Sequence, residues 1–153
     1  MVIKLIGCGA LGVACVIMAI SYRRFQWKKL DTVDGFIALI FYIKGQIDCY
    51  GMPLCDIMRS LPEDLDLPRD TRDFGQMLKG SKIYLEREAY RLLERFYSEF
   101  GSLYREEQIR RCDYYIEQLG EQRRLLFEDL PARTKIGGTI CICSLIGLLI
   151  ILW

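Results

Sequence analysis

Residues 136–153, IGGTICICSLIGLLIILW, form an uncharged apolar run of 18 residues at one end of the chain. A second run lies at the other end, where residues 3–22, IKLIGCGALGVACVIMAISY, contain a single charged side chain, Lys4. At a helical rise of about 1.5 Å per residue, such runs measure roughly 27–30 Å, the thickness of the hydrocarbon core of a bilayer. Buried helices of soluble proteins are usually shorter and have a polar stripe. The sequence therefore predicts two transmembrane helices.

The first apolar run has features of both a signal peptide and a membrane anchor. Lys4 could act as the basic start of a signal peptide. The run is long, however, and no clean A-x-A cleavage site follows it. Four basic residues come directly after it, Arg23, Arg24, Lys28 and Lys29. We therefore expect an uncleaved anchor.

Basic side chains flank both apolar runs on the sides that face the middle of the chain. The first cluster lies within residues 23–29, and Arg133 and Lys135 precede the second run. Positively charged flanks of membrane spans stay in the cytoplasm. We predict a two-span protein of the cell membrane, with both ends reaching across the bilayer. Its parts are a transmembrane helix at 3–22, a cytoplasmic helical domain at 23–135 and a transmembrane helix at 136–153.

The composition of the middle segment excludes several classes of function. Residues 23–135 hold 20 basic and 20 acidic side chains. This neutral balance argues against a nucleic-acid partner, which favours a basic face. The chain has no histidine, so it cannot form a Ser-His-Asp triad or a Cys/His zinc site. We expect a protein that is not an enzyme and that holds no cofactor or metal.

Helical periodicity begins directly after the first apolar run. Apolar positions recur at three- and four-residue steps and predict a helix from near Arg23 to Tyr50, which continues the first span. Gly51 ends this helix, and Pro53 opens a short one. The long stripe consists of Leu30, Val33, Ile37, Ile40, Lys44 and Ile47, and the short helix has Leu54, Ile57, Met58 and Leu61 on one side.

Two further helical stripes follow an irregular connection around Pro62, Pro68 and the acidic residues 63–66. No stretch shows sustained strand alternation. We therefore predict an all-α fold, in which two transmembrane helices flank a small cytoplasmic helical bundle or a long helical hairpin. One stripe is Leu85, Ala89, Leu92, Phe96 and Phe100, broken at 101–102, and the last is Ile109, Cys112, Ile116, Leu119, Leu126 and Leu130, ending at Pro131.

Small residues and cysteines form a third pattern. Cys8, Gly12 and Ala19 lie near one face of the first span, and Thr139, Cys143 and Gly147 repeat every fourth residue in the second. Such spacing lets two membrane helices pack closely, although membrane helices are also rich in small residues for other reasons. Outside the spans lie Cys49, Cys55 and Cys112, an odd number, which fits small apolar residues in a reducing compartment and leaves a thiol-based activity as an alternative.

Tyrosines are frequent along the middle segment. An aromatic-rich helical surface suits docking of a protein partner, although many of these rings could instead cover a small core. Breaks between helices leave side chains that their own bundle cannot cover. We therefore predict partner contacts at three such positions, Tyr50, Leu54 and Phe100.

The order of these features resembles a known family. A basic cluster follows the first span, and residues 43–54, IKGQIDCYGMPL, lead into the short helix at 56–62, DIMRSLP. Phe100-Gly101-Ser102 interrupts the following helices, with Gln108 soon after and a final apolar span at the end. Over essentially the whole chain this layout is similar to the stage III sporulation protein AB family of endospore-forming bacteria.

The resemblance implies a function as well as a fold. It implies a scaffold in the channel apparatus between mother cell and forespore, on the mother-cell side of the engulfing membrane. The soluble part of that family resembles the platform subunit of type II secretion and type IV pilus machines. The implied partners are the lipid bilayer, other subunits of the sporulation complex and the cognate ATPase, with a homo-oligomer also possible. The alternative is a small holin-like pore formed by the two spans.

Overall fold

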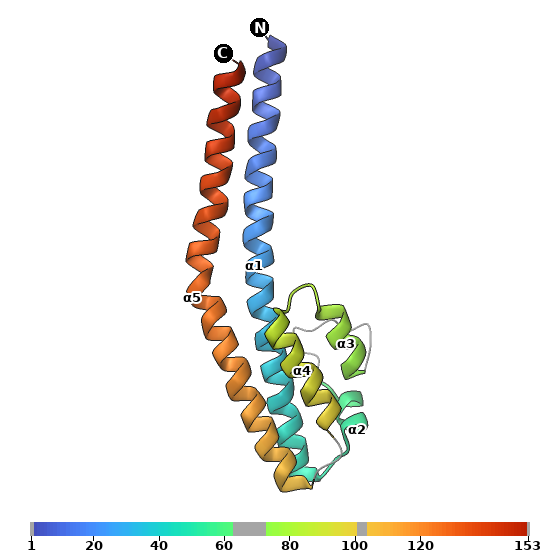
Figure 1. Cartoon of the computed structure of the whole chain (residues 1–153). Helices are drawn as coiled ribbons and strands as arrows, with labels where there is room; N and C mark the ends of the chain where they lie inside the picture. The colour runs from blue at the N-terminus through green and yellow to red at the C-terminus, as the bar shows by residue number, and fades with distance from the viewer. Residues whose placement is uncertain (1, 63–72, 101–103, 153) are drawn as a thin grey trace. The chain divides into compact units, whose positions relative to one another are not determined.

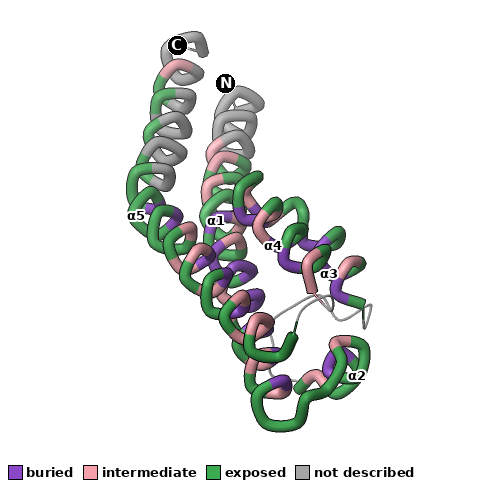
Figure 2. The backbone as a smooth tube through the Cα atoms, turned by 60° about the horizontal axis from the view of Figure 1, so that its bottom comes forward, coloured by how far each residue is buried: buried purple, intermediate pink, exposed green. Residues whose placement is uncertain are grey.

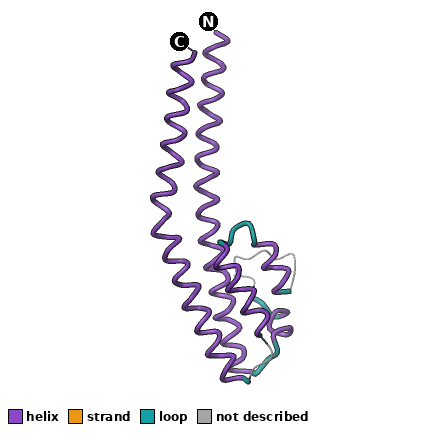
Figure 3. Tube along the Cα trace, in the orientation of Figure 1, coloured by secondary structure: helices purple, strands orange, loops and turns teal. Residues whose placement is uncertain are grey.

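The computed structural model describes residues 2–62, 73–100 and 104–152, and it describes few of the side chains before residue 12 and after residue 132. Within these ranges every regular element is a helix and no strand occurs (Figures 1 and 3). The predicted all-α class is therefore confirmed. The helices are α1 (Val2–Tyr50), α2 (Leu54–Arg59), α3 (Phe74–Ser81), α4 (Arg87–Glu99) and α5 (Arg105–Leu152).

The chain divides into two compact units. The central unit is Lys28–Leu126, and the terminal unit combines Met1–Trp27 with Phe127–Trp153. Both long helices, α1 and α5, therefore contribute to both units. The central unit begins and ends inside the predicted cytoplasmic domain 23–135.

Aromatic rings join four helices in the core of the central unit. Phe36 of α1 contacts Phe74 of α3 edge-on, with ring centroids 5.9 Å apart. Phe74 lies 5.6 Å from Phe96 of α4, which in turn meets Tyr115 of α5 at 5.3 Å. The three phenylalanines are at most 1% exposed. Buried aromatic contacts of this kind are among the largest single contributions to a small core.

The face of α1 that the central unit buries is wider than the predicted stripe (Figure 2). Leu30, Val33, Ile40 and Ile47 are buried as predicted, whereas Ile37 and Lys44 are half-buried. Neighbouring positions missing from the predicted stripe, Phe36, Leu39 and Ile43, are fully buried. A helix surrounded by several others buries more than one narrow stripe.

Lys44 follows the apolar stripe for a reason that periodicity alone did not give. Its ammonium group forms an ion pair with the Asp113 carboxylate of α5 at 2.5 Å. A lysine can cover apolar surface with its methylene stem while the charged end stays near water. In Lys44 the methylene stem therefore covers apolar surface, and the ammonium group joins α1 to α5.

The predicted boundary between the first two helices is confirmed. Gly51 has φ +61°, and its N–H donates to the Ile47 carbonyl at 3.1 Å. A left-handed residue at this position is the usual end of a helix, and glycine adopts it without steric cost. Pro53 is the N-cap of α2, and its carbonyl accepts the N–H groups of Asp56 and Ile57 at 3.0 and 3.2 Å.

Helix α3 was not predicted, because its eight residues include two glycines and are too short for a clear period. Its buried side chains, Phe74, Met77, Leu78 and Ser81, nevertheless recur at helical spacing. Helix α4 buries Ala89 and Phe96 as predicted, but it buries Leu93 in place of the predicted Leu92, which is half-buried. The irregular connection predicted around 63–66 and Pro68 lies outside the described residues.

Helix α5 continues through Pro131, where the predicted cytoplasmic helix ended. Proline has no N–H, so the Phe127 carbonyl cannot receive the usual helical hydrogen bond from residue 131. The predicted spans 3–22 and 136–153 fall within α1 and α5, but most of their side chains lie outside those described. Among the residues that are described, no helix is long and apolar enough to cross a bilayer.

Candidate partner-docking site

The end of α1 and the start of α5 meet at one end of the central unit. The Arg105 guanidinium donates a hydrogen bond to the Asp48 backbone carbonyl and lies 3.5 Å from the Asp48 carboxylate. Farther along the same helix pair, Lys44 pairs with Asp113 and Arg123 with Asp34. These contacts place the two helices antiparallel, as Figure 1 shows. They also bring residue 50 close to residue 104.

Exposed aromatic and apolar side chains gather at this end. Tyr50 is 72% exposed and Tyr104 is 91% exposed. Met52, in the connection between α1 and α2, is 40% exposed. Aromatic residues and methionine are enriched at the centres of protein interfaces. We call Tyr50, Met52, Leu54 and Tyr104 the α1–α5 tip.

The structure places the three predicted docking residues at the same end of the central unit, but their side chains differ in exposure. Tyr50 extends from the last turn of α1, and Leu54 opens α2 with its side chain half-buried. Phe100 caps α4 and is also half-buried, with its ring 5.0 Å from that of Phe96. Part of Phe100 therefore belongs to the core. Four residues of chain reach at most about 14 Å, so Phe100 and Tyr104 lie within that distance.

Tyr104 is the tip residue that the sequence did not single out. It is one of several tyrosines in the middle segment, and its residue type gave no reason to prefer it. Its position between the break at 101–102 and the first turn of α5 was the available signal. Helix breaks leave side chains uncovered, and Tyr104 is the most exposed of the large hydrophobic side chains described here.

An ionic cluster fixes α4 against α5 beside Phe100. The Glu99 carboxylate accepts hydrogen bonds from Arg111 at 2.6 Å and from the Tyr115 hydroxyl at 2.9 Å. Arg111 also lies 3.5 Å from Glu107, one turn earlier on α5. Burial, with help from the Glu99 hydrogen bond and charge, raises the pKa of Tyr115 to about 12. The hydroxyl therefore stays protonated and keeps donating at neutral pH.

The space inside this cluster is too small for a ligand. Its volume is about 10 Å³, enough for roughly one water molecule. Cavities that bind small molecules usually measure about 300–1,000 Å³. The cavity is lined by Phe96, Glu99, Phe100, Gln108, Arg111 and Tyr115. These residues serve the packing of α4 on α5.

The cysteines of the middle segment differ in exposure. Cys112 is fully buried, and burial raises the pKa of its thiol to about 11. A thiol of this kind is a poor nucleophile, because the thiolate is the reactive form. Cys49 and Cys55 are exposed. Among the described residues, no group of three or more Cys, Asp or Glu side chains is placed to hold a metal ion.

The six residues predicted to pack two membrane helices together lie in the terminal unit. Gly12 and Ala19 are half-buried in α1, whereas Thr139 and Cys143 are exposed on α5. A Cβ atom added at Gly147 would meet no described atom within 4 Å, so the helix surface has room there. The side chain of Cys8 lies outside the described residues. Close packing through these positions stays a prediction.

Comparison with known proteins gives no relative, because no family model, curated protein or solved structure matches the chain.

Proposed function

We propose that this protein is a non-enzymatic membrane scaffold whose apolar ends anchor it in a bilayer and whose central unit docks a subunit of a membrane-bound machine. The observation that carries the proposal is the exposure of α1 within the terminal unit. Five apolar side chains there are each 51–71% exposed: Val13, Val16, Ile17, Met18 and Ile20. Soluble proteins rarely leave such a contiguous apolar surface uncovered. Lipid chains are the partner that covers an apolar helix without specific contacts.

The charge pattern supports a cytoplasmic central unit. Arg23, Arg24 and Lys28 follow the exposed apolar segment on α1, and Lys135 precedes the second apolar run on α5. Under the positive-inside rule these flanks stay in the cytoplasm. The Lys28–Leu126 unit would then face the cytoplasm, with the α1–α5 tip available to a soluble or peripheral partner.

The family resemblance supplies the identity of the proposed machine. We propose that the scaffold works in the sporulation channel apparatus between mother cell and forespore. In this proposal the α1–α5 tip docks the secretion-type ATPase or a neighbouring membrane subunit. The large exposed tyrosines at the tip support this role, because aromatic anchors account for much of the binding energy of protein interfaces.

Topology is the first test of the proposal. A reporter inserted near Asp66 should behave as cytoplasmic, and a reporter fused after Trp153 should lie on the far side of the membrane. Labelling of the Asp66 site from outside by an impermeant reagent would reverse the orientation. Recovery of the full chain in the soluble fraction would refute membrane anchoring.

Partner capture is the second test. Full-length protein solubilised from sporulating cells should retain its partner, and Tyr50→Ala or Tyr104→Ala should weaken retention about thirtyfold, equivalent to ~2 kcal/mol. Leu54→Ala and Phe100→Ala should weaken it less, because both side chains are half-buried. Phe41→Ala is the matched control: this aromatic residue of α1 is 67% exposed and lies about 13 Å along the helix from Tyr50.

Circular dichroism of each variant separates loss of docking from loss of folding. Equal retention by the folded Tyr50, Tyr104 and Phe41 variants would place the docking surface elsewhere. If the wild-type chain retains no partner and instead makes vesicles leak, the holin-like pore replaces the scaffold.

A further inference from the structure

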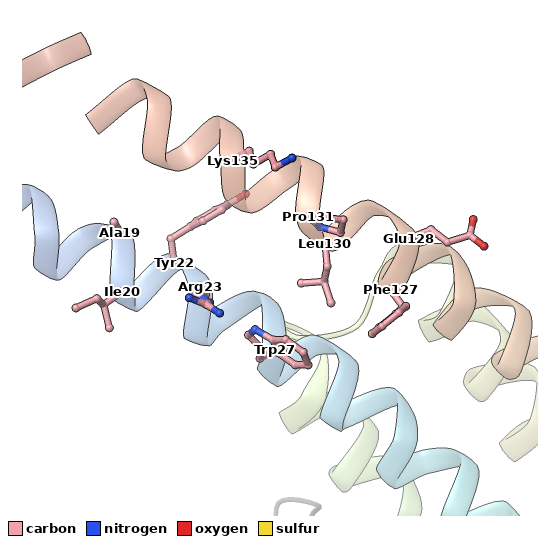
Figure 4. Close-up of a pocket in the computed structure, with 10 residues that line it drawn as sticks. All are labelled: Ala19, Ile20, Tyr22, Arg23, Trp27, Phe127, Glu128, Leu130, Pro131 and Lys135. Atoms are coloured by element: carbon pink, nitrogen blue, oxygen red, sulfur yellow. The ribbon is translucent and has the colours of Figure 1, made fainter. Parts of the chain in front are cut away.

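A cavity of about 790 Å³ lies between α1 and α5 within the terminal unit (Figure 4). Its volume falls in the range of sites that bind small molecules, about 300–1,000 Å³. Helix α1 contributes Tyr22, Arg23 and Trp27 to its lining, and α5 contributes Phe127, Leu130 and Lys135. The partner-docking proposal does not use this cavity.

The lining combines an apolar floor with two positive charges. Leu130 is buried, whereas Tyr22, Trp27 and Phe127 are 42–54% exposed. Arg23 and Lys135 are both exposed, and they approach the cavity from different helices. Glu128 is also in the lining, but Figure 4 shows its carboxylate directed away from Arg23 and Lys135. The two cations are therefore the charged groups available to a ligand.

Pro131 explains why α5 leaves space here. The residue lines the cavity and lies inside the helix. Without an N–H it removes one backbone hydrogen bond, and its ring crowds the preceding turn, which bends a helix locally. The Phe127 carbonyl, which loses its usual helical donor, belongs to a residue of the same cavity wall.

The position of the cavity along the sequence indicates the kind of ligand. Tyr22 is the last residue of the first apolar run, and Lys135 is the residue before the second. Both therefore lie at the level where a spanning helix passes from lipid chains to headgroups. Tyrosine and tryptophan favour this level, and basic residues there attract anionic lipids.

We propose that this cavity binds one anionic phospholipid, with the phosphate between Arg23 and Lys135 and an acyl chain along Ala19 and Ile20. The two positive charges match an anionic headgroup, and the apolar lining matches an acyl chain. A soluble anion would match the charges but would leave the apolar lining uncovered. The inference rests on the proposed membrane anchoring, because the lipid reaches the cavity only from a bilayer.

The test uses the full chain with Trp153→Phe, so that Trp27 in the cavity wall is the remaining tryptophan. The protein is reconstituted in phosphatidylcholine vesicles that contain equal amounts of brominated phosphatidylcholine or brominated phosphatidylglycerol. Bromine quenches tryptophan fluorescence on contact, so the ratio of quenching measures the preference for the anionic lipid. We expect several-fold preference for phosphatidylglycerol.

Single substitutions assign the preference to the cavity. Arg23→Gln or Lys135→Gln should each reduce it about fivefold, the factor that corresponds to ~1 kcal/mol per basic residue near an anionic surface. Arg24→Gln is the matched control, because it removes the same charge from the next residue of α1, which does not line the cavity. It should change the preference less than twofold.

The remaining outcomes separate this inference from the proposed function. Equal quenching by both lipids, or equal losses for Arg23→Gln and Arg24→Gln, would overturn the lipid site and leave membrane anchoring intact. Displacement of the brominated lipid by inorganic phosphate alone would show an anion site and overturn the phospholipid. A chain that does not float with the vesicles would refute membrane anchoring itself.

Discussion

Two segments of the same helix differ sharply in how their apolar side chains are covered. Between residues 30 and 47 of α1, Leu30, Val33 and Phe36 are at most 4% exposed within the central unit. Between residues 13 and 20, Val16 and Met18 are 57% and 71% exposed. Both segments are apolar and helical. A helix therefore does not determine by itself which of its apolar side chains are buried, because other helices cover residues 30–47 and leave residues 13–20 exposed.

The largest effect is expected in the core of the central unit, where other helices of the chain bury the apolar side chains. Phe74→Ala removes a ring that is 1% exposed and contacts Phe36, Phe96 and Tyr97. The free energy of unfolding should fall by about 3–5 kcal/mol, because a large cavity remains. Chemical denaturation of the full chain in detergent, followed by circular dichroism, measures it.

Ile83→Ala is the control for this prediction, since Ile83 is 72% exposed and should change stability by less than about 0.5 kcal/mol. Similar losses for both variants would mean that α3 does not pack on the core as described.

The next-largest effect tests what covers the apolar side chains of residues 13–20 of α1. Ile17→Lys places a charge where Ile17 is 58% exposed. If lipid covers this position, insertion should become less favourable by about 2.5–3.5 kcal/mol. A glycosylation-based insertion assay in microsomes measures the change.

The comparison variant is Ile83→Lys: this side chain is also exposed, at 72%, but it lies in the central unit and its change should leave insertion unchanged. An Ile17→Lys variant that inserts as well as the wild type would mean that water covers residues 13–20.

A smaller effect should appear at high pH, because two buried groups of the central unit hold their protons more tightly in the folded state. The pKa rises from 10.0 to about 12 for Tyr115 and from 9.0 to about 11 for Cys112. The stability that these protons contribute is therefore complete below pH 9. It is lost as pH rises from 9 to 12, at up to ~1.4 kcal/mol per pH unit for each group.

Denaturation curves at pH 8 and pH 10.5 check this dependence. Tyr115→Phe should make the loss shallower, whereas Tyr114→Phe, at a neighbouring exposed ring, should not. A slope that is the same in all three proteins would show that the Tyr115 proton is not coupled to folding.

The smallest effect is expected at the surface ion pairs of α1 and α5. Asp113→Asn removes the partner of Lys44, which lies 2.5 Å away. Asp113 is 56% exposed, so water screens the pair and the loss should be about 0.2–1 kcal/mol. A double-mutant cycle with Lys44→Met isolates the pair energy. A coupling of several kcal/mol would indicate a far drier α1–α5 contact.

Local signals in the sequence predicted the long helices and their first boundary. The end of α1 at Tyr50 and the start of α2 after Pro53 follow from the backbone preferences of Gly51 and Pro53, which act within a few residues. Helix α3 was missed because its eight residues are too short for a period. It is stabilised by Phe74, whose partners come from α1 and α4.

The candidate site was predicted in part. Tyr50 lies at a break that the sequence marks, and the structure places it on the exposed tip. Tyr104 lies at the same tip because the neighbouring Arg105 donates a hydrogen bond to Asp48, 57 positions earlier in the sequence. The half-buried state of Phe100 likewise depends on Phe96 and on the α4–α5 contact. Contacts between residues so far apart leave no periodic trace in the chain.

The sequence by itself determined the helical class, the two apolar ends and the absence of imidazole chemistry, because these depend on residue type and on spacing within one helix. Only the tertiary structure decided which apolar side chains the chain covers, which tyrosines share one end, and where Arg23 and Lys135 line a common cavity. The physical reason is that burial and charge proximity are properties of pairs of helices. Their pairing is set by packing across the whole unit and not by any one segment.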